Sequence, residues 1–181
     1  KKLYTLLALT ITFSMNAQLT AVSEGGNTGQ RLSTSNASNH GDIGSNAVDL
    51  SYSNSSSSTR GATGNYSTAM GINTTASGYA STAMGDSSTA SGESSTAMGL
   101  ATTASGNYST AMGYSTTASG LFSTAMGEGT SASGSRSTAM GRNTTASGYA
   151  STAMGEGTSA SEVISTAMGY NTTASGSSST A

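Results

Sequence analysis

The chain has 181 residues with no cysteine and no proline, and its six basic and eight acidic residues give a formal net charge of −2. So few basic side chains exclude binding to nucleic acid or to anionic membrane surfaces, which need a basic footprint. Disulfide bonds are excluded as well, so backbone pairing and packing must stabilise the fold.

The chain begins with a secretory pattern. Lys1 and Lys2 precede an apolar run from residue 3 to residue 13, and Ala17 offers a small residue for cleavage. The apolar run is too short to span a bilayer. We therefore expect residues 1–17 to be a signal peptide that directs the protein out of the cytoplasm.

Residues 18–60 differ from everything that follows them. Residues 24–44 are rich in glycine, asparagine and serine, which predicts a loop. Residues 47–52 alternate apolar and polar side chains and predict a strand. Residues 53–60, SNSSSSTR, predict a flexible connector. We expect this segment to combine a loop, a cap over the end of the repeats and a connector to them.

From residue 61 onward, one pattern repeats every 14 residues. Each repeat contains Ser-Thr-Ala-Met-Gly, as at residues 67–71, and a second block such as Thr-Thr-Ala-Ser-Gly at residues 74–78. Glycine at every seventh position costs a helix about 1 kcal/mol relative to alanine, which disfavours a coiled coil. Short threonine-rich segments bounded by glycine instead predict two strands and two bends per repeat. We expect residues 61–181 to form an all-β parallel β-solenoid with 14-residue coils about 4.8 Å apart.

Side-chain alternation assigns the faces of these strands. Ala69 points away from the side that carries Thr68 and Met70, and Ala76 is likewise opposite its two neighbours. Turning the alanines inward gives a core without hydroxyl groups, whereas the reverse choice buries threonine and serine without partners. The expected core is a thin stack of alanines. Its members include Ala69, Ala76, Ala83, Ala90, Ala97 and Ala104.

The same alternation places one methionine per coil on the outside. These residues are Met70, Met84, Met98, Met112, Met126, Met140, Met154 and Met168. Burying each of them contributes about 1.5–3 kcal/mol, more than an alanine can offer. Because exposed apolar stripes mark interfaces, we predict a homo-oligomer packed along this column. The alternative is that methionine fills the interior of a single wide coil.

Segments such as STAMGLATTASGNY (residues 95–108) and STAMGYSTTASGLF (residues 109–122) carry a family resemblance. This pattern resembles the head repeats of YadA-like trimeric autotransporter adhesins, and the resemblance covers residues 61–181. It implies a left-handed β-roll, a homotrimer of side-by-side chains, and an adhesive head displayed on a Gram-negative outer membrane or outside the cell. The implied function is non-enzymatic attachment to host cells, other cells or surfaces, without a cofactor.

The sequence departs from that family in three places. Threonine and methionine replace the branched aliphatic pair of the first strand. Glu162 stands where glycine is expected and precedes Val163 and Ile164, which predicts an altered turn or a lost contact in that coil. The last residues, 178–181, stop in mid-repeat, so we expect a fragment whose membrane attachment depends on a missing C-terminal part.

The sequence contains no pattern typical of catalysis or metal binding. His40 is the only histidine, and we expect it to be a solvated loop residue. The pairs Asp86/Glu93 and Glu128/Glu156 are expected to be scattered surface acids. Because no serine lies in a strand–turn–helix context, we predict no enzyme activity, no metal and no cofactor.

Two surfaces are candidates for recognition. Aromatic side chains in the variable turns suit binding to a protein or a glycan, or packing across subunits. They are Tyr66, Tyr79, Tyr108, Tyr114, Phe122, Tyr149 and Tyr170. Outward hydroxyls, as at Thr89 and Ser91, recur in every coil and resemble the threonine grids of ice-binding solenoids. Ice binding is therefore one alternative function, and a ligand-free spacer in a fibre is another.

Overall fold

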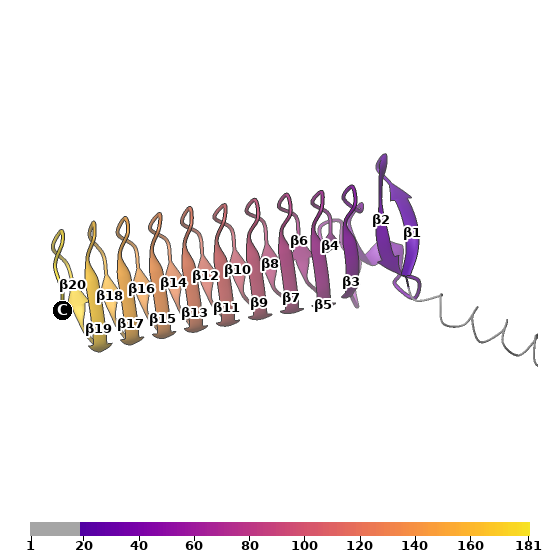
Figure 1. The fold of residues 1–181 in the computed structure, drawn as a ribbon. Helices are drawn as coiled ribbons and strands as arrows, with labels where there is room; N and C mark the ends of the chain where they lie inside the picture. The colour runs from indigo at the N-terminus through magenta and orange to yellow at the C-terminus, as the bar shows by residue number, and fades with distance from the viewer. Residues whose placement is uncertain (1–18) are drawn as a thin grey trace, which may run out of the picture.

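The protein is a rod of stacked coils. The computed structural model describes residues 19–181, so the predicted signal peptide lies outside the described residues. A hairpin lies at the N-terminal end of the rod and the C-terminus at the other end (Figure 1). Two long sheets form opposite walls, one of eleven strands and one of nine. The predicted all-β parallel β-solenoid is confirmed.

The first sheet takes one five-residue strand from each coil. From residue 68 onward, the Thr-Ala-Met-Gly segment and the residue after it supply this strand, whereas VDLSY (residues 48–52) supplies the first one. The strands are β3 (Val48–Tyr52), β5 (Thr68–Ile72), β7 (Thr82–Asp86), β9 (Thr96–Leu100), β11 (Thr110–Tyr114), β13 (Thr124–Glu128), β15 (Thr138–Arg142), β17 (Thr152–Glu156) and β19 (Thr166–Tyr170). They pair in parallel and in register, so equivalent residues of successive repeats lie side by side.

The second sheet takes two residues from each coil. Its strands are β4 (Gly61–Ala62), β6 (Thr75–Ala76), β8 (Thr89–Ala90), β10 (Thr103–Ala104), β12 (Thr117–Ala118), β14 (Ser131–Ala132), β16 (Thr145–Ala146), β18 (Ser159–Ala160) and β20 (Thr173–Ala174). This sheet is also parallel and in register. The 14-residue period of the sequence therefore becomes the repeat of both walls.

Alanine side chains meet between the two walls. The alanines of both sheets, from Ala69 to Ala167, are fully buried, including the six expected core residues. The expectation of a core without hydroxyls is wrong, because Ser67 and Thr74 are buried too. Each precedes an alanine by two residues, so alternation turns it inward as well. Within residues 19–181, several such hydroxyls, including that of Ser81, have no hydrogen-bond partner, which weakens an already thin core.

Glycine is the fourth residue of every first-sheet strand from β5 to β19, and these glycines form a column along the sheet. Gly113, with φ +121°, lies beside Gly127 of the next coil. A Cβ atom at Gly113 would overlap the main-chain oxygen of Gly127. Glycine is therefore required in this column by the closeness of the coils as well as by its backbone angle.

The N-terminal segment adds a hairpin to the first sheet. Strand β1 (Leu19–Glu24) pairs antiparallel with β2 (Asn27–Leu32), and β2 pairs parallel with β3. The predicted loop over residues 24–44 is therefore wrong for residues 27–32. The missed signal is Gly25-Gly26, whose positive φ angles form a two-residue hairpin turn. A 3₁₀ turn, η1 (Ala37–Asn39), follows β2.

Glu162 changes one contact without breaking the stack. Strands on both sides of it keep their register. Its main-chain N–H donates to Ser165 Oγ (3.2 Å), whereas Gly148 in the preceding coil donates to the Ala160 carbonyl (3.3 Å). The expected loss of a contact is confirmed. The reason is steric, because glycines in this column lie too close to the next coil to carry a Cβ atom.

Candidate functional site

The predicted methionine interface lies on the outer face of the first sheet. Each methionine of the repeats pairs with its equivalent in the next coil, from Met70 to Met168. The column continues to Leu50, which pairs with Met70. The six inner methionines are half-buried, whereas Met70 and Met168 are 41% and 51% exposed. The structure thus assembles a continuous apolar column, hereafter the methionine column.

The last residue of each first-sheet strand forms a second, mixed column at one edge of the rod. Tyr114 and Tyr170 lie in it, each more than half exposed. Arg142 stands between Glu128 and Glu156, and its guanidinium donates to the Glu156 carboxylate. Exposed ion pairs of this kind contribute little stability. Because Arg142 separates these two acids, they do not form a carboxylate dyad.

The opposite edge is formed by the turns that lead from each second-sheet strand to the next first-sheet strand. We call it the turn edge; it runs along the top of the rod in Figure 1. It carries Tyr66, Tyr79, Tyr108, Phe122 and Tyr149. It also holds Glu93, so the suggested pair of Asp86 with Glu93 is divided between the two edges.

The aromatic side chains of the turn edge contact one another across coils. The ring centroids of Tyr66 and Tyr79 are 5.4 Å apart in an edge-to-face arrangement. Tyr108 and Phe122 are stacked, with centroids 4.9 Å apart. The Arg136 guanidinium lies 5.3 Å from the centre of the Tyr149 ring, a cation–π contact. These three clusters were not predicted, because the coil geometry decides which turn residues meet.

Several bulky residues of the turn edge adopt left-handed backbone angles. Tyr66, Tyr108 and Phe122 have φ between +57° and +59°, and Ile164 has φ +56°. This conformation costs an L-residue roughly 1–2 kcal/mol, and bulky or β-branched side chains rarely adopt it. The sequence pattern gave no indication of this strain.

The outward hydroxyls suggested for ice binding lie on the second sheet. Thr89 and Thr103 are adjacent in register and half-buried, and the serine two residues after each is exposed. They form two parallel columns on the wall opposite the methionine column.

A buried polar cluster closes the N-terminal end of the alanine core. Asp49 lies beside Ala69 in the register, and Arg31 lies beside Asp49, so both stand in line with the alanines. Arg31 Nε donates to Asp49 Oδ2 (3.2 Å), and its Nη1 donates to Glu24 Oε1 (2.7 Å). Nη2 donates to the Gly41 carbonyl (2.9 Å). The cluster therefore ties β1, β2 and the following loop to the first coil.

His40 belongs to this cluster, so its prediction as a solvated loop residue is wrong. Its ring is fully buried, with Nδ1 3.0 Å from Asp49 Oδ2. Burial is favourable because the Asp49 carboxylate provides a partner, which a pattern of local residues could not reveal. Ser51 Oγ donates to Asp49 Oδ1 (2.6 Å) and lies 3.5 Å from the same His40 nitrogen. Ser51 is therefore held by the carboxylate and is no nucleophile activated by the imidazole.

The pKa of Asp49 makes the cluster sensitive to acid. Burial acts to raise this pKa, but hydrogen bonds from His40 and Ser51 together place it below the ordinary 3.8. The carboxylate therefore contributes stability above about pH 3.8, and this contribution is lost as the pH falls through the lowered pKa. We expect the difference in urea midpoint between the wild type and Asp49→Asn to shrink from about pH 4 to pH 2. A constant difference over that range would contradict this assignment.

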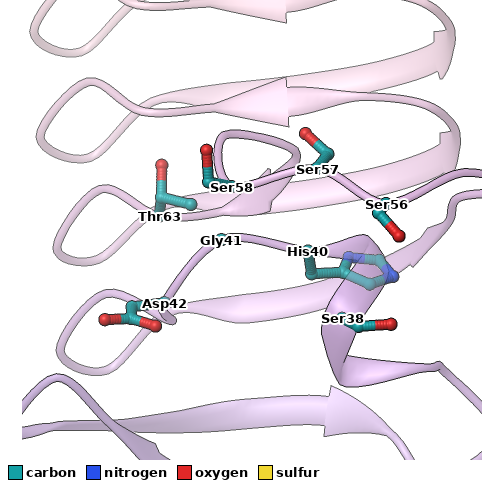
Figure 2. A pocket seen from close by; sticks show the side chains of 8 residues that line it. All are labelled: Ser38, His40, Gly41, Asp42, Ser56, Ser57, Ser58 and Thr63. Atoms are coloured by element: carbon teal, nitrogen blue, oxygen red, sulfur yellow. The ribbon is translucent and has the colours of Figure 1, made fainter.

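An open cavity of about 630 Å³ lies beside the cluster (Figure 2). Its walls are Ser38, His40, Gly41, Asp42, Ser56, Ser57, Ser58 and Thr63. The His40 ring is closed off from solvent, so its imidazole could not act on a molecule in the cavity. The cavity therefore offers hydroxyl groups and one carboxylate but no pair of nucleophile and base.

Among residues 19–181, no group of three or more histidine, aspartate or glutamate side chains could hold a metal ion. None of the helical segments in the same range has the length and apolar character needed to cross a membrane.

The chain matches the model of a known protein family. The family model described as YadA head domain repeat (2 copies) matches five consecutive segments, which together make up more than half of the chain. These are residues 62–88, 90–116, 118–144, 146–163 and 165–181. No curated protein matches the chain.

Proposed function

Because the chain belongs to the YadA head domain repeat family, we propose that residues 61–181 are the head of a non-enzymatic adhesin. The head assembles as a homotrimer through the methionine column. It is exported and displayed at the cell surface or outside the cell, where it attaches to a protein or glycan on another surface. The family match supports an adhesin of this general type.

The observation that carries the proposal is the methionine column. The inner core of one coil is built from alanine methyl groups, each worth about 0.8 kcal/mol on burial. A fully buried methionine contributes about 1.5–3 kcal/mol, and the methionine of every coil keeps part of its surface exposed. Covering the methionine column would therefore add apolar stabilisation that a single chain does not use. Neighbouring copies of the chain would cover it.

Charge placed in the methionine column should separate the subunits. We expect the exported wild-type protein to sediment as a trimer and the variant Met98→Glu/Met112→Glu to sediment as a monomer, because the carboxylates would be buried without partners. The matched control is Thr103→Glu/Thr117→Glu, which adds the same charges to the same coils on the opposite wall. This control should remain trimeric.

Attachment is measured on the same proteins. Beads coated with wild-type protein should adhere to cell monolayers, and the monomeric variant should adhere at least tenfold less, because three linked heads bind with avidity. A wild-type protein that sediments as a compact monomer would contradict the proposed homotrimer. Wild-type beads that do not adhere would remove the adhesin function, and thermal hysteresis in that sample would favour ice binding.

A further inference from the structure

We propose that the part of the turn edge between Tyr66 and Phe122 is a glycan-binding site that takes neutral sugars. This inference rests on the proposed adhesin function and names its ligand class. The rings of Tyr79, Tyr108 and Phe122 stack against sugar rings, and Glu93 accepts hydrogen bonds from sugar hydroxyls.

The fold does not require these aromatic residues. Equivalent turn positions in neighbouring coils hold Ala80 and Ser94, which adopt the same left-handed angle as Tyr66, Tyr108 and Phe122. At Tyr108 and Phe122, bulky side chains therefore stand on a left-handed backbone where small residues suffice. The aromatic side chains also bury only about half of their surface, because they are 45–54% exposed. Strained side chains that leave half of their surface open point to a role in recognition.

The rings are held in place but remain accessible. Tyr108 and Phe122 cover one face of each other, and their exposures of 45% and 49% leave about half of each ring open. In the two coils before Tyr108, the equivalent position holds only Ala80 and Ser94. Rigid aromatic side chains bind with little loss of conformational entropy.

Polar groups of the kind that bind hydroxyls lie beside the rings. Tyr108 Oη donates to Glu93 Oε1 (3.1 Å), which raises the pKa of Tyr108 and fixes the carboxylate next to the ring. The side-chain oxygen of Asn107 accepts from the Glu93 main-chain N–H (3.0 Å), which fixes a second polar side chain beside the rings. Aromatic faces bordered by a few fixed polar groups are suited to a ligand with both apolar and hydroxyl surfaces.

Two other ligand classes fit this edge poorly. A peptide cannot add as a strand, because the turn N–H groups already bond to the preceding coil, as Ser94 does to Tyr79 and Tyr108 does to Glu93. An anionic ligand is disfavoured because Glu93 is the one charged side chain on this part of the described edge. A neutral glycan needs no free main-chain N–H group and carries no negative charge that Glu93 would repel.

Native electrophoresis in gels that contain a neutral polysaccharide tests the site. The probes are hydroxyethyl cellulose, mixed-linkage β-glucan and galactomannan. We expect at least one of them to retard the wild-type trimer, and Tyr108→Ser/Phe122→Ser to lower the apparent affinity at least fivefold. Serine already occupies this position at Ser94, so the variant should fold and sediment as the wild type does. Tyr170→Ser, which removes a 69% exposed ring from the opposite edge, is the matched control and should bind normally.

The outcomes separate this inference from the proposed function. Wild-type beads that adhere to cells, together with no retardation by any probe, would overturn the glycan site and leave the adhesin in place. Adhesion that survives glycosidase treatment of the target cells would point to a protein ligand and overturn the site too. A serine variant that loses the trimer would identify the turn edge as a subunit contact, which also overturns it. If the wild-type protein neither adheres to cells nor is retarded by any probe, both the adhesin function and the glycan site are wrong.

Discussion

Replacing Gly113 with alanine should destabilise the rod by about 3 kcal/mol or more, the largest effect we expect from a single added methyl group. The new Cβ would overlap the main-chain oxygen of Gly127, which the in-register β-ladder holds in place. Neither strand can move away without breaking pairing on its other side. Urea-induced unfolding followed by circular dichroism measures the loss.

The matched control for this change is Gly169→Ala. Gly169 has nearly the same backbone angle, φ +117° against +121°, but it lies in the last described coil. Its nearest neighbour would be Thr172 Cγ2 at 3.7 Å, an ordinary contact. We expect the free energy of unfolding of this variant to fall only by the cost of backbone strain, about 1–2 kcal/mol. Equal losses at both positions would mean that the backbone angle, and not the closeness of the coils, requires glycine.

Replacing Asp49 with alanine should destabilise the N-terminal end by about 3–5 kcal/mol, because it leaves the buried Arg31 charge without its inner partner. The ring of His40 would lose its partner as well. We expect faster proteolysis before residue 60 and a lower urea midpoint. Hydrogen exchange should locate the loss in β1, β2 and β3 and spare the coils beyond them, since each coil contacts its neighbours alone.

The variant Asp49→Ala/Arg31→Met separates charge from shape. It removes both buried charges and continues the alanine core with apolar side chains that need no hydrogen-bond partner. Replacing a buried ion pair in this way is often neutral or stabilising, so we expect most of the lost stability to return. A double variant as unstable as Asp49→Ala would mean that hydrogen bonds from the cluster, more than the unpaired charge, hold the N-terminal end.

Features that depend on the nearest residues in the sequence could be predicted. The 14-residue period, the change of direction at glycine and the alternation around Ala69 and Ala76 determine strands, turns and inward faces. The inward faces follow from period-2 geometry within five residues, and the turns follow from glycine at fixed positions. The same geometry, applied two residues further back, would have shown that Ser67 and Thr74 point inward.

Features that depend on residues far apart in the sequence could not be predicted from it. His40 looks like a loop residue until β3 brings Asp49 to it, and Arg31 approaches Asp49 from a hairpin 18 residues earlier. The aromatic residues of the turns could be listed from the sequence. Their pairing across coils and the left-handed angles of Tyr108 and Phe122 arise from how the coils stack.

Because the coils are in register, the length of the rod can change in fixed steps of one coil. Because each coil presents to its neighbours the same alanine, glycine and methionine positions, loss or gain of one whole 14-residue unit keeps these three columns continuous across both junctions. Only contacts between variable residues, such as Tyr108 with Phe122, would differ at a new junction. Each added or lost coil would lengthen or shorten the rod by about 4.8 Å and leave its cross-section the same.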